Sequence, residues 1–291
     1  MDLTNVLLGC GIALVMGYTG LLFSWSELRR HMGPARVRAL VGLAVANYLV
    51  IPAMTYAFFR MSAEPTALRL TLLTMAILPC APLVPAMVSF AGEKPEWSLL
   101  VFLAFSVLNL GLVIVLTAVL SQTQHRGVVQ ADVLHGLGGY VAAVYGPMLL
   151  GIFVRWVAPN RAAGLNRIVR PLSGATLLVA LISFGIVHRE DFAATSLSDL
   201  GVMFLFVIAC ILVVAPLGER AGGPRMTRLI ASGFRNVALA IAFSTLVLQR
   251  NDVSAGIVIF AGVAGIVCAG VIGLSAIVRH LGTGQFGVRP R

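Results

Sequence analysis

Long apolar runs, separated by short polar connections, constrain the fold of this chain more than any other feature of its sequence. An α-helix needs about 20 apolar residues to cross the hydrocarbon core of a bilayer. The runs do not alternate between apolar and polar residues, so helices are favoured over strands. Since only 11% of the 291 residues are charged, the sequence predicts an all-α polytopic membrane protein and excludes a soluble enzyme, a disordered protein and a coiled coil. We expect about nine transmembrane helices, at about residues 5–24, 37–59, 68–90, 98–120, 135–157, 173–188, 199–217, 226–248 and 253–278.

The basic residues are distributed unevenly between the two sides that nine spans would create. One side, with the C-terminal tail, holds 15 Lys and Arg residues, and the other side holds five. By the positive-inside rule, this ratio predicts a multi-pass protein of the plasma (inner) membrane, with the N-terminus outside and the C-terminus in the cytoplasm. Residues 282–291 are expected to form a mobile cytoplasmic tail. The basic connections are expected to contact anionic lipid, and nucleic acid is not an expected partner.

Arg235 is the one charged residue that falls deep inside an apolar run, away from the ends of the run. It lies about nine residues from the start of the run, which is about 13 Å along a helix. A charge at this depth costs about 2.5–3.5 kcal/mol and is expected to face a cavity or a partner. The sequence therefore predicts a functional site at Arg235, with a structural hydrogen-bonding role as the alternative.

Two of the runs contain features that interrupt helices. The third run carries Pro79, Pro82 and Pro85 at a spacing of three, and each proline removes a helix donor. The eighth run contains Ser232-Gly233-Phe234-Arg235-Asn236 in its middle. Irregular backbone at membrane depth is tolerated only where protein surrounds it. We therefore predict two discontinuous helices that cross near Pro79–Pro85 and Gly233–Asn236.

The order of the runs indicates an internal repeat. Runs one to four, about residues 5–120, correspond to runs six to nine, about residues 173–278, and run five at 135–157 lies between them. Five spans separate corresponding elements, so the repeats are inverted. Inverted repeats with matching broken helices are typical of secondary transporters, which bind substrate where the broken helices meet. Residues 1–291 are accordingly expected to form one integral membrane transporter domain.

Four segments, in order along nearly the whole chain, resemble bile acid:sodium symporters. They are Gly17-Tyr18-Thr19-Gly20-Leu21, Asn47 with Pro52 five residues later, the Pro79 segment, and Gly233-Phe234-Arg235-Asn236-Val237-Ala238-Leu239. The resemblance implies a carrier of organic anions whose sodium site includes Asn47 and Asn236. No cofactor other than sodium is implied.

The sequence also departs from the pattern of these symporters at the implied sodium site. Ala231 stands where the family has a glutamate, and Arg235 stands where it has a glutamine. The remaining sodium-ligand candidates are Asn47, Ser98 and Asn236. Because a fixed guanidinium can supply the positive charge of the missing ion, we expect transport without sodium coupling.

The leading hypothesis is a secondary transporter of a small or amphipathic organic anion, and not an enzyme. Three alternatives stay open: a sodium-coupled symporter of the family type, an oxyanion efflux carrier resembling the arsenite carriers, with Cys80 as a sulfur ligand, and a non-transporting membrane sensor or partner subunit. The sequence does not indicate the substrate, the transport direction or the oligomeric state. The predicted substrate-binding residues are Arg235, Asn236, Asn47, Gly233, Pro79, Cys80, Pro82 and Pro85.

Some residues in the apolar runs are expected to have only structural roles. Cys210 and the other cysteines lie inside runs and are interpreted as small packing residues. Tyr140 lies near a run end and is predicted to belong to an interfacial aromatic belt.

Overall fold

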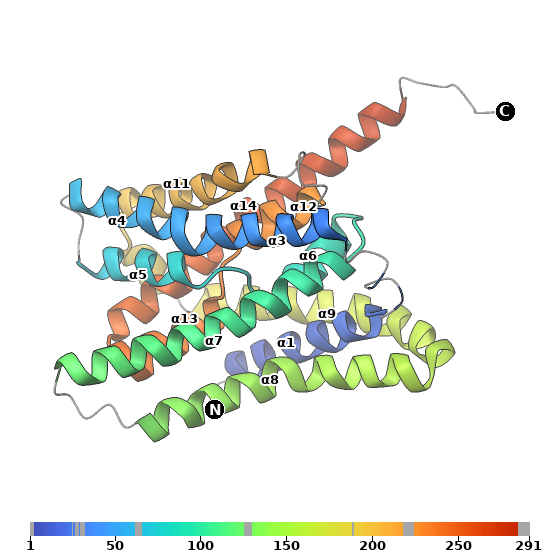
Figure 1. Cartoon of the computed structure of the whole chain (residues 1–291), viewed down its shortest axis with the longest axis horizontal. Coiled ribbons are helices and arrows are strands. Elements are labelled where there is room, and N and C mark those ends of the chain that lie inside the picture. Colours follow the sequence, from blue (N-terminus) through green and yellow to red (C-terminus); the bar gives the residue numbers. More distant parts are fainter. Residues whose placement is uncertain are drawn as a thin grey trace.

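A computed structural model describes residues 3–24, 26, 29, 33–61, 66–124, 130–187, 189–217 and 224–284. All regular elements among these residues are helical (Figure 1). The α-helices are α1 (Leu3–Leu22), α3 (Pro34–Val45), α4 (Ile51–Met61), α5 (Thr66–Ile77), α6 (Val84–Phe90), α7 (Glu96–Gln124), α8 (Gln130–Val157), α9 (Pro159–Val187), α10 (Arg189–Ala194), α11 (Leu197–Val214), α12 (Arg225–Gly233), α13 (Val237–Phe243) and α14 (Asn251–Gly284). The π-helical turn η1 (Ala46–Val50) continues α3, and the π-helical turn η3 (Ser244–Leu248) continues α13. The 3-10 turn η2 (Ala215–Leu217) continues α11.

Helices occupy each of the nine apolar runs, which confirms the all-helical prediction. Within the described residues, six helical segments are long and apolar enough to cross a membrane. The apolar helices Gly9–Leu22 and Thr66–Ile77 are shorter. The number of spans therefore stays a prediction. The six segments are Pro34–Met61, Glu96–Leu120, His135–Val157, Leu197–Leu217, Arg225–Leu248 and Asn251–Val278.

Helix α9 differs from the expected sixth run because it begins earlier. The sequence predicted a run at 173–188 after a basic connection, whereas α9 starts at Pro159 and only Ala158 separates it from α8. Proline fits the first position of a helix, and arginine is a good helix former. Arg161, Arg167 and Arg170, which were expected to lie in a connection, therefore lie in the N-terminal part of α9.

Helix α1 packs mainly against α8 and α9. The close approach depends on glycine: a Cβ added to Gly20 would clash with the carbonyl oxygen of Met148, and one added to Gly151 would clash with that of Gly17. Small residues permit this kind of packing between membrane helices, where van der Waals contact replaces the hydrophobic effect. The three helices form one group, and in Figure 1 α8 lies at the bottom of the bundle, far from α11 at the top.

The second group contains the two interrupted helices, formed by α5 with α6 and by α12 with α13. α5 packs against α4 and α14, and α12 packs against α6, α11 and α14. The two interrupted helices run in opposite directions. The turn after α6 lies beside the start of α12, since the backbone N–H of Met226 donates to Glu93 Oε1 at 3.2 Å. At the other end, Thr71 on α5 lies beside Val253 at the start of α14.

Candidate functional site

The helix interruptions lie where the sequence predicted them. α5 ends at Ile77 and α6 begins at Val84, and α12 ends at Gly233 and α13 begins at Val237. Pro79 and Pro82 lie in the first interruption, and Pro85 is buried in the first turn of α6, where a missing N–H costs no helical bond. The prediction of two discontinuous helices is confirmed.

The two interruptions lie against each other and satisfy each other's backbone groups. Because membrane depth offers no water, unpaired N–H and C=O groups there must find partners within the protein. Cys80 adopts a left-handed conformation with φ of 61°, which directs the first interruption toward the second. Three backbone hydrogen bonds join the interruptions. The N–H of Cys80 donates to the carbonyl oxygen of Ala231 at 3.1 Å, the N–H of Ala81 donates to that of Phe234 at 3.0 Å, and the N–H of Asn236 donates to that of Leu78 at 2.9 Å.

Arg235 lies in the second interruption and is 0% exposed. Its Nη1 donates to Asn47 Oδ1 at 2.9 Å, and its Nη2 donates to Cys210 Sγ at 3.1 Å. Its Nε is buried and has no hydrogen-bond partner. Among the described residues, none forms an ion pair with this guanidinium. A full positive charge is therefore held at the crossing by neutral groups.

Asn47 is positioned so that its amide oxygen faces Arg235. Its Nδ2 donates to the carbonyl oxygen of Leu43 and to Ser232 Oγ, both at 2.9 Å, which fixes the orientation of the amide. Asn47 lies in the π-helical turn η1, between α3 and α4. Single π-helical turns occur frequently at functional sites. Asn47 therefore connects α12 and Arg235 to the helix that precedes the first interrupted one.

Asn236 connects the crossing to α8. Its Nδ2 donates to the hydroxyl of Tyr140 at 2.9 Å, and its Oδ1 accepts from the backbone N–H of Leu239 at 3.2 Å. The expectation that Tyr140 belongs to an interfacial aromatic belt is wrong, because Tyr140 is buried against the crossing. α8 begins at Gln130, earlier than the apolar run suggested, and this places Tyr140 well inside the helix.

A third polar contact supports the first interruption and was not predicted. Asn109 on α7 donates from Nδ2 to the carbonyl oxygen of Pro79 at 2.8 Å. The hydroxyl of Tyr48 donates to Asn109 Oδ1 at 2.7 Å. Asn109 is an amide in the middle of an apolar run, and this signal could have identified it.

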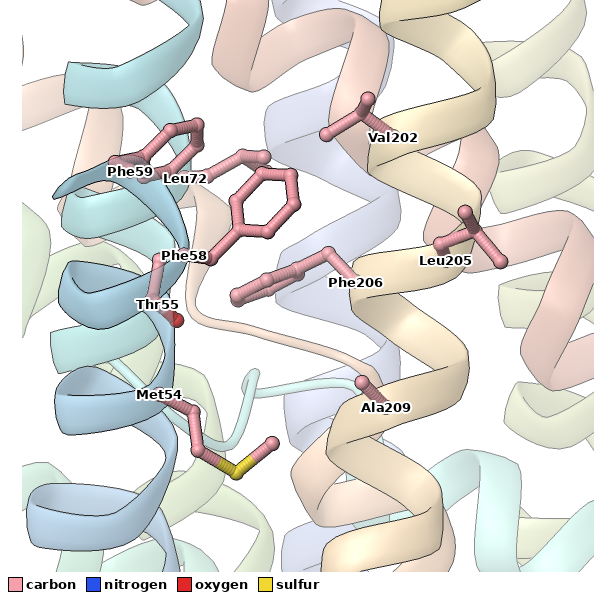
Figure 2. Close-up of a pocket in the computed structure, with 9 residues that line it drawn as sticks. All are labelled: Met54, Thr55, Phe58, Phe59, Leu72, Val202, Leu205, Phe206 and Ala209. Atoms are coloured by element: carbon pink, nitrogen blue, oxygen red, sulfur yellow. The ribbon is translucent and has the colours of Figure 1, made fainter. Parts of the chain in front are cut away.

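Phe206 separates Arg235 from an apolar groove between α4 and α11. The guanidinium carbon lies 6.0 Å from the centre of the Phe206 ring. On its other side the groove has a volume of about 210 Å³, and Phe58 and Phe206 point into it from opposite walls (Figure 2). Phe206 therefore contributes a wall to the groove and covers the charged group with an aromatic ring.

Most of the predicted site residues meet at the crossing. Asn47, Arg235, Asn236, Pro79 and Cys80 are joined by the contacts above. Gly233 ends α12, and a Cβ there would lie 3.0 Å from Ile211 and 3.3 Å from Cys268 Sγ. Cys210 was expected to be a packing residue, but it also accepts a hydrogen bond from Arg235.

The structure does not bring Ser98 to the crossing. Its Oγ donates to the carbonyl oxygen of Pro95 at 2.7 Å, in the first turn of α7. Asn109, which does contact the crossing, lies 11 residues later on the same helix, a separation of about 16 Å. Asn47 and Asn236, the other two sodium-ligand candidates, have amide oxygens that already accept hydrogen bonds. The described residues contain no group of three or more His, Cys, Asp or Glu that could hold a metal ion.

Comparison with known protein families gives a match over residues 10–195, to the sodium bile acid symporter family. The chain belongs to the sodium bile acid symporter family. The match covers Asn47 and the first interrupted helix and ends before Arg235. No match was found among curated proteins. With its apolar helices, the chain is a multi-pass membrane protein of a transporter family, and the family resemblance seen in the sequence is confirmed.

Proposed function

We propose that this protein is a sodium-independent secondary transporter of a small or amphipathic organic anion. In this proposal the Arg235 guanidinium takes the place of a bound cation at the crossing of the two interrupted helices. The observation that carries the proposal is the complete burial of Arg235 without an acidic partner among the described residues.

The electrostatics of the crossing support this role. A charge at membrane depth is expensive, and removing water strengthens every interaction that it makes. Asn47 Oδ1 and Cys210 Sγ accept hydrogen bonds but carry no formal charge to cancel that of Arg235. The crossing therefore has a positive potential that does not depend on an ion from solution. An anionic substrate is the natural partner of such a potential.

The oxygen atoms available at the crossing also argue against a sodium ion beside Arg235. Sodium would need the amide oxygens of Asn47 and Asn236, and both already accept hydrogen bonds from the protein. A second cation beside a buried guanidinium would add repulsion in a medium of low dielectric constant. No step of the proposed transport therefore requires sodium.

Further features of the architecture belong to the proposal. We expect nine spans in two inverted repeats, because the interrupted helices run in opposite directions and each is followed by a long helix, α7 or α14. We also expect a cytoplasmic C-terminus. Arg36, Lys94 and Pro224 line one hollow, so the connections that precede α3, α7 and α12 lie at the same end of the bundle, in agreement with the charge count.

The groove beside Phe206 supports an amphipathic substrate. Its lining is apolar and lies one ring away from the guanidinium. A substrate with an anionic head and an apolar body, such as a bile acid, could place its head near Arg235 and its body along apolar helix surfaces. The substrate-binding role extends in this proposal to Asn47, Asn236, Gly233, Cys80 and the prolines of the first interruption.

The test is uptake into proteoliposomes. A thermal-stability screen of organic anions, including a bile acid, first identifies a stabilising compound. Its uptake is then measured in sodium chloride and in choline chloride, for the wild type and Arg235→Gln, with Arg250→Gln as a control because Arg250 is exposed and pairs with Asp252. Equal uptake in both salts and loss in Arg235→Gln alone are expected. Uptake that collapses in choline would restore the sodium-coupled alternative, and stabilisation without uptake would favour a sensor.

A further inference from the structure

A second hollow lies away from the crossing, at the end of the bundle where the connections that precede α3, α7 and α12 meet. It has a volume of about 280 Å³. Its walls carry both acidic and basic side chains, in contrast to the apolar groove beside Phe206. We call it the interfacial pocket, and its lining residues are Arg36, Glu93, Lys94, Glu96, Trp97 and Pro224.

The position of the interfacial pocket places it at the level of lipid headgroups. Three of the membrane-crossing segments begin at its walls, at Pro34, Glu96 and Arg225. Tryptophan, arginine and lysine at the ends of such segments are typical of the membrane–water interface. The walls of the pocket therefore lie at the depth where the headgroup layer of the membrane begins.

Three residues that line the pocket each have a buried polar side-chain atom without a hydrogen-bond partner. Trp97 is 3% exposed, and its Nε1 is an unpaired donor. Glu93 Oε2 and Glu96 Oε2 are unpaired acceptors. Each such group loses its hydration without compensation, which costs free energy. Since one is a donor and two are carboxylate acceptors, a ligand that pairs with all three would offer both an acceptor and hydrogen-bond donors.

The charges around these atoms narrow the choice of ligand. The guanidinium of Arg36 lies 5.2 Å from the centre of the Trp97 ring, so a cation and the unpaired indole N–H are close together. Glu93 and Glu96 supply two carboxylates, one in the connection between α6 and α7 and one at the first residue of α7. A ligand with an anionic oxygen for Arg36 and Trp97, and an ammonium for the carboxylates, would match both kinds of group in the lining of the pocket.

We propose that the interfacial pocket binds a zwitterion composed of a phosphate and a primary ammonium joined by a short spacer. The headgroup of phosphatidylethanolamine has this chemistry and is present at the depth of the pocket. Phosphatidylcholine has the same charges but no N–H donor, and phosphatidylglycerol has the phosphate but no ammonium. The pocket therefore distinguishes these three lipids by whether they offer Glu93 and Glu96 a positively charged N–H donor.

Occupancy of the pocket would also affect the interrupted helices. Glu93 accepts from the backbone N–H of Met226 through Oε1, so its carboxylate pairs with the first turn of α12. A ligand held by Glu93 Oε2 would fix the connection after α6 against the start of α12. The connection after α6 and the start of α12 are the ends of the two interrupted helices that lie nearest to the pocket.

The test compares lipids added to the delipidated full chain in detergent. Phosphatidylethanolamine is expected to raise the melting temperature by several degrees more than phosphatidylcholine or phosphatidylglycerol. Glu96→Gln and Trp97→Phe are expected to lose this preference. Glu190→Gln, which changes an exposed carboxylate on α10, is the matched control and should keep it.

A second measurement keeps the proposal testable if the variants fold poorly. With Trp25 and Trp156 replaced by phenylalanine, Trp97 is the remaining tryptophan, and its fluorescence should change on addition of phosphatidylethanolamine only. Soluble phosphoethanolamine separates the sources: if it reproduces the effect, the ligand can be a free zwitterion, and if it does not, the pocket reads a lipid headgroup. Equal responses to the three lipids, or a preference that survives in Glu96→Gln, would overturn the proposal.

Discussion

The hydrogen-bond donors of Arg235 are used unevenly, and this supports the proposed role of the residue in transport. Its two terminal nitrogens bond to Asn47 and Cys210, while Nε has no partner. A buried arginine with only a structural role would be expected to satisfy all its donors, since each unmet donor costs free energy. The uncompensated charge and the free donor both favour a role in anion transport.

Replacing Asn47 by aspartate tests this charge directly. A carboxylate in place of the amide oxygen, which lies 2.9 Å from Arg235 Nη1, would form a buried ion pair and cancel the positive potential of the crossing. Asn47→Asp is therefore expected to fold but to lose anion uptake, as measured in proteoliposomes. Asn251→Asp adds the same charge at an exposed position and should transport normally. Unchanged uptake in Asn47→Asp would show that the potential of Arg235 is not used.

Tyr140 provides a second test at the scale of a residue. Tyr140→Phe removes the hydroxyl that accepts from Asn236, a loss of about 0.6 kcal/mol for a hydrogen bond between membrane helices. Because this contact links α8 to the crossing, we expect the uptake rate to fall more than the thermal stability. Tyr56→Phe is the control, since Tyr56 is exposed on α4. A parallel loss of stability and uptake would indicate an ordinary packing contact.

The elements of the bundle differ in what holds them together. The interrupted helices are joined by backbone hydrogen bonds at the crossing, whereas α1 is held to α8 by close contact between glycines. The first kind of contact is directional and fixes the register of two segments. The second depends on the absence of side chains, so it is sensitive to a single added methyl group.

Gly20→Ala is predicted to destabilise the protein through the contact between α1 and α8. The added Cβ would overlap the carbonyl oxygen of Met148, so the helices must separate, at a cost of about 1–3 kcal/mol. The melting temperature in detergent is the measurement. Gly111→Ala on α7 is the control, because a Cβ there meets no atom within 4 Å. Equal melting temperatures for the two variants would mean that α1 packs less closely than described.

For the whole molecule, the number of spans decides where the termini lie. Nine spans place them on opposite sides of the membrane, whereas an even number places them on the same side. A reporter that is active only in the cytoplasm is expected to be active after Arg291 and inactive before Met1. A reporter that is active only outside should give the reverse pattern. The same result at both ends would exclude nine spans.

The sequence determined the features that depend on local chemistry. Apolar length predicted the helices because a membrane leaves the backbone few other ways to pair. The proline spacing and the Gly233–Asn236 cluster predicted both interruptions, since proline removes a donor and clashes within its own helix. Arg235 was identified because a charge in an apolar run is conspicuous without reference to any other residue.

The partners of these residues were decided by the tertiary structure. Asn47 and Arg235 are 188 residues apart, and Asn236 and Tyr140 are 96 apart, so no spacing rule relates them. The sequence therefore placed Tyr140 at an interface and Ser98 near the crossing, and the fold places neither there. Which polar groups meet depends on how the helices rotate and slide during packing, and a single apolar run does not encode that rotation. The charge at the crossing was determined by the sequence, and its neutral surroundings were determined by the fold.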